Sequence, residues 1–526
     1  MSQSTIIFSL SLHSLTNSVV DLTPHATPGK FRLLDCCQFL DNDVLAIHEF
    51  PDFPSLEYAA ISYVWKGLSV NNSTAAVQGR YGTFTIKGAE AGDPISINVL
   101  KHVCTATIQS KATYLWLDGL CIMQSNGDDK AWQIGRMYNI YKSCTLCIVL
   151  PGGIQRLVQP EDDEPVTWIQ RSWTLQEVLA PPRVGILFSW KYGEYRRSQS
   201  CSAAFTYTQV IKDESALCSL EHALSVHSGH LTLVTEQKVF KHLTLKIFGR
   251  INDAHVHTLL AILDGGRAGS EPGTQAIWRS SLMRTCTYPV DAVYSIMGVF
   301  GVTLDPHLFK QGDRQAATVA LAREILKNGG KASWLAPGLQ LPPCKGLSSF
   351  PEFPHVQAVG QATLTTEDGD RPVADLLPLV GKGWLQGIPM GTMDDTGYLT
   401  FSSKAAILVP AGHQSPSGDS FNKHVLQVTD ETQLTAGDGS VWKIHPDGEE
   451  AHGPQMRTFI VFLGSLTQYN SSVFGRRIDP WAERAMLVEE HEARKFHRRS
   501  YFMLPLALKP YIERCQSYTF CLGGPV

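Results

Sequence analysis

Short apolar segments alternate with amphipathic helical patterns between residues 58 and 188, and no other feature of the sequence constrains the fold as strongly. Helical patterns occupy residues 96–111 and 128–143, and a third helix is expected to begin near Ser172. The apolar segments are brief and rich in β-branched or aromatic residues, as buried strands are: "YAAISYVW", "TYLWLD", "CTLCIVLP" and "RVGILFSW". This alternation predicts an α/β fold with a parallel sheet that is covered on both faces.

The chain of 526 residues is too long for one ordinary hydrophobic core, so we expect several domains. Residues 1–57 form an N-terminal segment, in which "KFRLLDCCQFL" predicts a strand. Residues 58–190 form the α/β domain, and residues 191–334 form a mostly helical region. Residues 335–526 form a C-terminal domain that is β-rich or irregular, because proline, glycine and short alternating segments dominate it. Near its end, "PWAERAMLVEEHEARKFHRR" predicts a charged amphipathic helix.

Charge and composition exclude several classes of partner. The formal net charge is -4 and the isoelectric point is near 6.5, so the chain has no basic field for nucleic acid or an anionic membrane. No apolar run reaches about 18 residues, which predicts no membrane span. The 12 cysteines are scattered, and the N-terminus lacks the cationic start and cleavage site of a secretory signal. We therefore expect reduced thiols and a cytoplasmic location.

Motifs for phosphate, metal and nucleophilic chemistry are absent from the sequence. It has no Gly-x4-Gly-Lys loop, no strand-linked Gly-x-Gly-x-x-Gly and no Gly-x-Ser-x-Gly. "CTLC" has the gap of a zinc pair, but it lies in an apolar strand without a second pair, which favours buried structural thiols. The two histidines of "HEARKFH" are six residues apart and would not share a helix face. The sequence therefore predicts neither a metal nor a cofactor.

Polar and aromatic side chains follow the first two predicted strands. Ser62 and Trp65 lie at the end of the first strand, Asp118 ends the second, and Cys121 and Gln124 come shortly after it. Ligands of parallel sheets bind in the crevice outside the carboxyl ends of the strands. We therefore expect these five side chains to line one crevice.

The helix expected near Ser172 brings a carboxylate to the same crevice. Trp173, Gln176 and Glu177 are spaced i, i+3 and i+4 and share one helix face. The other face carries the residues expected to face the core: Leu175, Val178 and Leu179. A structural alternative is that Glu177 only anchors the helix, by bonding to a backbone amide or to Arg171.

Four stretches resemble, in order and spacing, the motifs of the fungal heterokaryon incompatibility (HET) domain. They are "YAAISYVWKG", "YLWLDGLCIMQ", "DDKAWQIGRMYNIYKSC" and "RSWTLQEVLAPPRV", and they run from Tyr58 to about Phe188. Weaker similarity continues through "RTCTYPVDAVYSIMGVFGV" and "AREILKNGGKASWL", and it ends near Leu335. Lys66 is a departure, because the family commonly has Trp-Gly here, and we expect the inserted lysine to alter the first loop.

The resemblance implies an intracellular fungal protein of non-self recognition, in which HET domains act as effectors of programmed cell death. It also implies a TIR-like, flavodoxin-like sheet, because the HET domain is considered a distant relative of the TIR domain. In enzymatic TIR domains a glutamate is needed to cleave NAD, and the matching position in this sequence is Glu177.

The chemistry of NAD cleavage is compatible with a single carboxylate. Breaking the nicotinamide–ribose bond passes through an oxocarbenium-like state, so a carboxylate that faces the developing cation lowers the barrier. Nicotinamide leaves as a neutral group, so no strong general acid is required. Trp65 or Trp173 is expected to stack on a ring of the substrate. The resemblance thus implies a catalytic Glu177, with NAD as substrate rather than cofactor.

Two other functions stay open at this point. In the first, the domain only assembles signalling complexes, through protein partners or self-assembly, and has no turnover. In the second, it is a HET-like enzyme recruited to a fungal secondary-metabolite pathway, and the crevice accepts another substrate. A Glu177→Gln chain assayed for nicotinamide release separates these functions from NAD cleavage.

Overall fold

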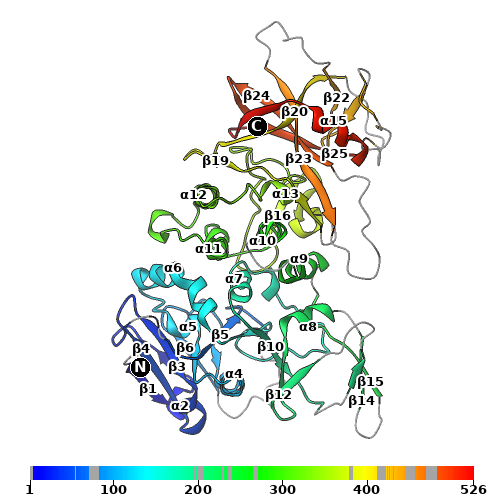
Figure 1. The fold of residues 1–526 in the computed structure, drawn as a ribbon. Coiled ribbons are helices and arrows are strands. Elements are labelled where there is room, and N and C mark those ends of the chain that lie inside the picture. Colours follow the sequence, from blue (N-terminus) through cyan, green and yellow to red (C-terminus); the bar gives the residue numbers. More distant parts are fainter. Residues whose placement is uncertain are drawn as a thin grey trace.

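The computed structural model contains two large β-sheets with a helical region between them (Figure 1). The first sheet and its helices fill the lower part of the view in blue to green, and the second sheet lies at the top in yellow to red, near the C-terminus. The structure describes these residues: 4–51, 53, 55–69, 82–192, 197–199, 206–227, 230–234, 240–250, 252–264, 270–377, 383–411, 422, 425, 427–429, 432–445, 456–468 and 483–526.

The first sheet has nine strands, of which the central four are parallel. In spatial order the strands are β1 (Thr5–Ser11), β4 (Val44–Phe50), β3 (Phe31–Asp35), β8 (Tyr114–Trp116), β5 (Tyr58–Tyr63), β9 (Leu146–Leu150), β10 (Val184–Ser189), β13 (Ser215–Ser219) and β12 (Tyr207–Ile211). The parallel strands are β8, β5, β9 and β10, and the pairs on either side of them are antiparallel. The α/β prediction is confirmed, but the sheet is mixed rather than wholly parallel, because hairpins at both edges extend it.

Helices cover both faces of the central strands, as the apolar pattern of the strands predicts. One face packs against α2 (Cys36–Asp41) and α4 (Ile97–Gln109). The other face packs against α6 (Gly127–Ser143) and α7 (Thr174–Leu179). A short helix, α5 (Asp118–Cys121), follows β8 directly.

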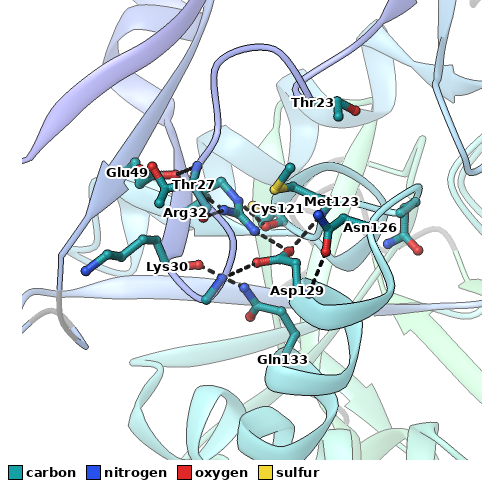
Figure 2. Close-up of polar contacts among 12 residues, drawn as sticks. Thr23, Thr27, Lys30, Arg32, Glu49, Cys121, Met123, Asn126, Asp129 and Gln133 are labelled. Carbon is teal, nitrogen blue, oxygen red and sulfur yellow. Dashed lines mark hydrogen bonds and ion pairs between the residues drawn. The ribbon is translucent and has the colours of Figure 1, made fainter. Parts of the chain in front are cut away.

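The N-terminal segment is part of the first sheet, because β3 pairs with β8 and carries β4 and β1 beyond it. A buried ion pair between Arg32 of β3 and Asp129 of α6 fastens this segment to the domain (Figure 2). Arg32 also donates from Nε to the Cys121 carbonyl oxygen at 2.8 Å. Asp129 accepts the backbone N–H groups of Gly29 at 2.8 Å and Met123 at 2.9 Å. The carboxylate therefore joins three separate pieces of chain.

Residues after the first sheet begin with strands and become helical later. A three-stranded sheet contains β11 (Arg197–Gln199), β14 (His230–Val234) and β15 (Phe240–Thr244), and α8 (Leu220–Ser225) lies between β13 and β14. The helical part follows, with α9 (Asp253–Asp264), α10 (Glu271–Met283), α11 (Asp291–Met297), α12 (Arg314–Lys327) and α13 (Leu335–Gly338).

Smaller elements fill the connections between the larger ones. They are α1 (Leu12–Leu15), the sheet of β2 (Val19–Val20), β6 (Thr83–Ile86) and β7 (Ile95–Ser96), the pair of β16 (Thr363–Thr366) and β17 (Gly369–Pro372), α14 (Val373–Leu376), and the 3-10 turns η1 (Trp168–Gln170), η2 (Gly298–Phe300) and η3 (Pro306–Leu308).

The C-terminal region is β-rich, as predicted, and five of its strands close into a ring of pairings. These strands are β20 (Leu399–Pro410), β23 (Thr458–Gln468), β24 (Glu483–Glu492), β25 (Lys495–Leu504) and β26 (Ser517–Leu522), and β26 pairs back to β20, which also pairs with β23. Four short strands extend the ring: β18 (Gly383–Gln386), β19 (Gly391–Met393), β21 (Gln433–Thr435) and β22 (Val441–Ile444). The 3-10 turn η4 (Leu506–Leu508) and α15 (Lys509–Arg514) precede β26.

The prediction of a helix over "PWAERAMLVEEHEARKFHRR" is wrong, because residues 483–499 belong to the β24–β25 hairpin; residues 480–482 lie outside the described residues. Its Ala, Glu, Arg, Met and Leu residues favour a helix in isolation. In the protein, residues 483–488 are buried continuously between β23 and β25, so packing from both sides overrides the local preference. Arg494 turns the hairpin with a positive φ of 62°.

One hydrophobic cluster runs through the whole molecule, from Val64 in the first sheet region to Leu522 in β26. Trp334 and Leu335, at the predicted boundary of the C-terminal domain, are buried within it. The three regions therefore share one core. Among the described residues, no helix is both long enough and apolar enough to cross a membrane.

Candidate functional site

Ser62 and Glu177 meet where the carboxyl end of β5 lies against α7. Side chains alternate along a strand, so Ser62 faces the same side as Tyr58 and Ala60, which pack against α6. The Ser62 hydroxyl donates a hydrogen bond from Oγ to Glu177 Oε2 at 2.5 Å. Trp168, in the turn before α7, donates from Nε1 to Ser62 Oγ at 2.9 Å. An indole N–H only donates, so the chain of bonds runs from Trp168 through Ser62 to the Glu177 carboxyl group.

Burial gives Glu177 an unusual acidity. Its exposed fraction is 8%, and burial raises the pKa of its carboxyl group to about 8. The hydrogen bond from Ser62 lowers this pKa, the negative charge of Asp118 raises it, and the cations of Arg284 and Arg171 lower it. The carboxyl group is therefore close to half ionised at mildly alkaline pH, where it can accept or release a proton.

Asp118 forms a second group at the end of β8. The indole of Trp65 donates from Nε1 to Asp118 Oδ2 at 2.7 Å, and the Gly119 amide donates to Oδ1 at 2.5 Å. Burial raises the pKa of Asp118, whereas its hydrogen bonds to Trp65 and Tyr63 lower it. Gln124 lies beside this group and donates from Nε2 to the Asp118 carbonyl oxygen at 2.8 Å.

Tyr63 connects the two groups. Its hydroxyl forms a hydrogen bond with Asp118, and burial together with the charges of Asp118 and Glu177 raises its pKa. Next to it is a small, partly open pocket, which Tyr63, Trp65 and Gly119 help to line. The Asp118 group thus borders a pocket, and the Glu177 group lies deeper in the domain.

The structure brings four of the predicted residues into these two groups, namely Ser62, Trp65, Asp118 and Glu177, and places Gln124 beside them. Three others are arranged differently. The Cys121 thiol lies in the core against α6, where burial raises its pKa to about 12. Trp173 hydrogen-bonds Asp291 of α11. Gln176 is buried, and its Nε2 has no partner among the described residues.

The predicted structural partners of Glu177 are also different. Arg171 does not pair with it, because its Nη1 donates to the carbonyl oxygens of Gln357 at 3.3 Å and Ala358 at 2.6 Å. Arg171 therefore ties the start of α7 to a segment that lies far away in sequence.

Three residues of the site are missed by the sequence interpretation: Trp168, Tyr63 and Arg284. Trp168 belongs to the 3-10 turn η1, which has no recognisable sequence pattern. Tyr63 follows Ser62 in β5, and its pattern indicates only an apolar strand residue. Arg284 lies more than one hundred residues after Glu177, and its only sequence signal is its place in "RTCTYPVDAVYS".

The arrangement contains two buried acids: Glu177, whose carboxyl group has a pKa of about 8, and Asp118, which lies beside a pocket. Across the described part of the chain, no group of three or more His, Cys, Asp or Glu side chains is placed to hold a metal ion. The two carboxyl groups themselves can transfer protons and, when ionised, stabilise positive charge.

Comparison with known proteins gives a partial match. The family model described as "Heterokaryon incompatibility protein (HET)" matches residues 58–163. The vegetative incompatibility protein HET-E-1 of Podospora anserina is 24% identical over 107 residues, which is 19% of this chain and 8% of that protein. No solved structure matches.

The matched range contains Ser62, Trp65 and Asp118, and it ends before Trp168 and Glu177. The four predicted motif stretches begin at the same residue, Tyr58, as the matched range. Residues 58–163 are therefore a heterokaryon incompatibility (HET) domain within a longer α/β fold.

Proposed function

We propose that this HET-domain chain is a cell-death effector of non-self recognition, and that it acts by cleaving NAD at the Ser62–Glu177 group. The observation that carries the proposal is the buried Glu177 carboxyl group, held by a single serine hydroxyl at 2.5 Å, with a pKa of about 8. Strongly perturbed acids of this kind concentrate at functional sites. The name of the Podospora protein, a vegetative incompatibility protein, supports the biological part of the proposal.

The order of the parallel strands supports a TIR-like or flavodoxin-like site. Numbered along the chain, the strands β8, β5, β9 and β10 have the spatial order 2-1-3-4, with which the flavodoxin-like order 2-1-3-4-5 begins. In that topology the ligand crevice lies between strands 1 and 3, which correspond to β5 and β9. Ser62 lies near the end of β5 and Glu177 lies in α7, the first α-helix after β9, which supports a site at this end of the sheet.

The proposed role of Glu177 is electrostatic. As a carboxylate it stabilises the positive charge that develops on the ribose while the bond to nicotinamide breaks and water forms the new bond to the same carbon, which gives nicotinamide and ADP-ribose. Ser62 fixes the orientation of the carboxylate through its hydrogen bond, and Trp168 in turn fixes Ser62. Trp65 and Tyr63 are the aromatic side chains that line the neighbouring pocket, and we propose that a ring of the substrate lies against them.

The experiment is nicotinamide release from NAD by the purified full-length chain. Glu177→Gln is expected to lower turnover at least about a hundredfold, because loss of one preorganised charge-stabilising group has effects of this size. Glu483→Gln is the matched control: Glu483 is also buried and also accepts one serine hydrogen bond, from Ser465 at 2.6 Å, but it lies in the C-terminal ring of strands. Equal turnover by the Glu177→Gln and Glu483→Gln chains would contradict the proposal.

A second candidate is a signalling module without turnover, which the burial of Glu177 favours. In this function the Trp168–Ser62–Glu177 bonds only lock α7 against β5. The same chains then release no nicotinamide, and cell death on expression in a fungal host persists after Glu177→Gln. Cell death lost together with turnover supports the first function.

A further inference from the structure

Arg284 reaches the site from the helical region, at the end of α10. Its exposed fraction is 1%, and its contacts fix the guanidinium group in place. Nε donates to Ser280 Oγ at 2.9 Å, and Nη1 donates to the Arg171 carbonyl oxygen at 2.8 Å and to Thr174 Oγ1 at 2.7 Å. Arg284 is thus bound to the first turn of α7, the helix that carries Glu177.

Within the described residues, no acid contacts this guanidinium group directly. Arg284 has no carboxylate within ion-pair distance in the part of the chain that the structure describes, and its Nη2 has no hydrogen-bond partner there. Thr174 and Glu177 are three residues apart in α7, a spacing that puts their side chains on neighbouring positions of one helix face. The positive charge therefore lies beside the turn of helix that presents the Glu177 carboxyl group.

The effect of each group on the other is reciprocal. Burial lowers the pKa of Arg284 to about 9, and the charge of Glu177 raises it. Arg284 likewise lowers the pKa of Glu177, in opposition to burial. A guanidinium group retains most of its charge at pH 7 under these conditions, so it acts on Glu177 throughout the neutral range.

We infer that Arg284 is a positioning residue of the candidate site: from the helical region it holds the first turn of α7 and places its buried positive charge beside the turn that carries Glu177. The inference rests on the proposed function in one respect: that the ionised Glu177 carboxylate takes part in NAD cleavage. It implies that the site requires the helical region as well as α7, both of which lie beyond residue 163, where the family match ends.

Other titratable groups around Glu177 do not supply the same charge. Arg171 is the other cation that lowers its pKa, but its guanidinium group is engaged with the carbonyl oxygens of residues 357 and 358. The remaining groups around Glu177 are acids and bring no positive charge: Asp118 of α5, Tyr63 of β5, Tyr141 of α6 and Cys147 of β9. His255 of α9 faces Arg284, and burial lowers the pKa of this histidine to about 3, so it is neutral.

The test measures the ionisation of Glu177 without any substrate. The free energy of unfolding is measured from pH 5 to pH 10 for each full-length chain, with and without the added Glu177→Gln substitution. The difference between the two curves reports the pKa of Glu177 in the folded protein. The pKa of Glu177 is compared between the wild type, Arg284→Met and Arg284→Gln. Both substitutions remove the charge, and Arg284→Gln keeps an amide donor for Thr174 and the Arg171 carbonyl oxygen.

Loss of Arg284 is expected to raise the Glu177 midpoint by about one pH unit or more, the usual effect of removing a close opposite charge. Arg284→Lys keeps a positive charge on a side chain of different shape, and it is expected to raise the Glu177 midpoint less. Arg314→Met is the matched control, because Arg314 is another buried arginine of the helical region, its Nη1 donates to the Pro354 carbonyl oxygen, and its charge acts on Cys286. In Arg314→Met the titration midpoint of Glu177 is expected to stay at the wild-type value.

Two results would overturn the inference. One is an unchanged Glu177 midpoint in every folded Arg284 variant, and the other is an equal shift in Arg314→Met. Nicotinamide release, measured separately, then tests the function: its pH profile is expected to move with the Glu177 midpoint. If the midpoint moves but no chain cleaves NAD, the positioning role holds and the proposed function fails.

Discussion

Asp129 and Glu177 are both buried acids of the same domain, yet their surroundings are opposite. Asp129 has an exposed fraction of 0%, an ion pair with Arg32 and two backbone N–H donors, and Figure 2 shows these contacts converging on its two oxygens. Glu177 has one side-chain donor, Ser62, and a raised pKa. A fully satisfied acid holds a fold together, whereas an acid that the fold leaves short of partners is the better candidate for chemistry.

The largest expected effect is the loss of the satisfied acid. Asp129→Asn leaves the Arg32 guanidinium buried without its ion partner, which typically lowers the free energy of unfolding by about 3–5 kcal/mol. Denaturant unfolding measures the change. The neighbouring Asp128 is exposed, so Asp128→Asn is the control and is expected to stay within about 0.5 kcal/mol of the wild type. Equal stability of the two variants would show that Asp129 does not stabilise the fold through its ion pair.

Ser62→Ala is expected to have the next largest effect on stability. It leaves both the Trp168 N–H and the Glu177 carboxyl group without their protein partner, and unsatisfied buried groups destabilise by about 1–3 kcal/mol. Ser465→Ala is the matched control, since it removes one bond to Glu483, and it is expected to lose about 1 kcal/mol. A loss for Ser62→Ala no greater than for the control would mean that the three-residue chain of bonds does not act as a unit.

The pH dependence of stability is expected to show the perturbed acid directly. In the unfolded chain a glutamate has a pKa near 4.5, whereas Glu177 in the folded protein has a pKa of about 8. Between these values the folded state binds more protons, so raising the pH destabilises it, by at most about 1.4 kcal/mol per pH unit. Glu177→Gln removes this contribution and is expected to be the more stable chain above pH 8. A parallel pair of curves would show that Glu177 titrates normally.

The smallest expected effect concerns the second acid of the site. Trp65→Phe removes the indole donor to Asp118 and retains an aromatic ring in the pocket, which is expected to destabilise by about 1 kcal/mol. The removed bond lowers the pKa of Asp118, so this pKa is expected to rise further in the variant. NMR titration of the Asp118 carboxyl carbon measures it, and an unchanged value would show that the indole does not influence the acid.

The sequence predicts those parts of the fold that depend on local patterns. The helix over residues 128–143 has two acids at its start and a lysine at its end, and α6 begins and ends within one residue of that range. The β24–β25 hairpin is missed, because its residues prefer a helix and only the contacts with distant strands decide otherwise. Contacts between residues that are distant in sequence also decide which side chains form the candidate site. Strand-end positions identify Ser62 and Asp118, but no local pattern reveals that Arg284 lies against α7.

The pairing of β3 with β8 has a practical consequence for anyone who wishes to express the HET domain by itself. A fragment that starts at Tyr58, where the family match begins, lacks the strand that covers β8. It would present an open row of backbone donors and acceptors, which is a template for aggregation. The folded unit therefore starts well before the recognisable motif, and a well-behaved fragment of the domain needs the stretch from Thr5 onward, because β1 in turn covers β4.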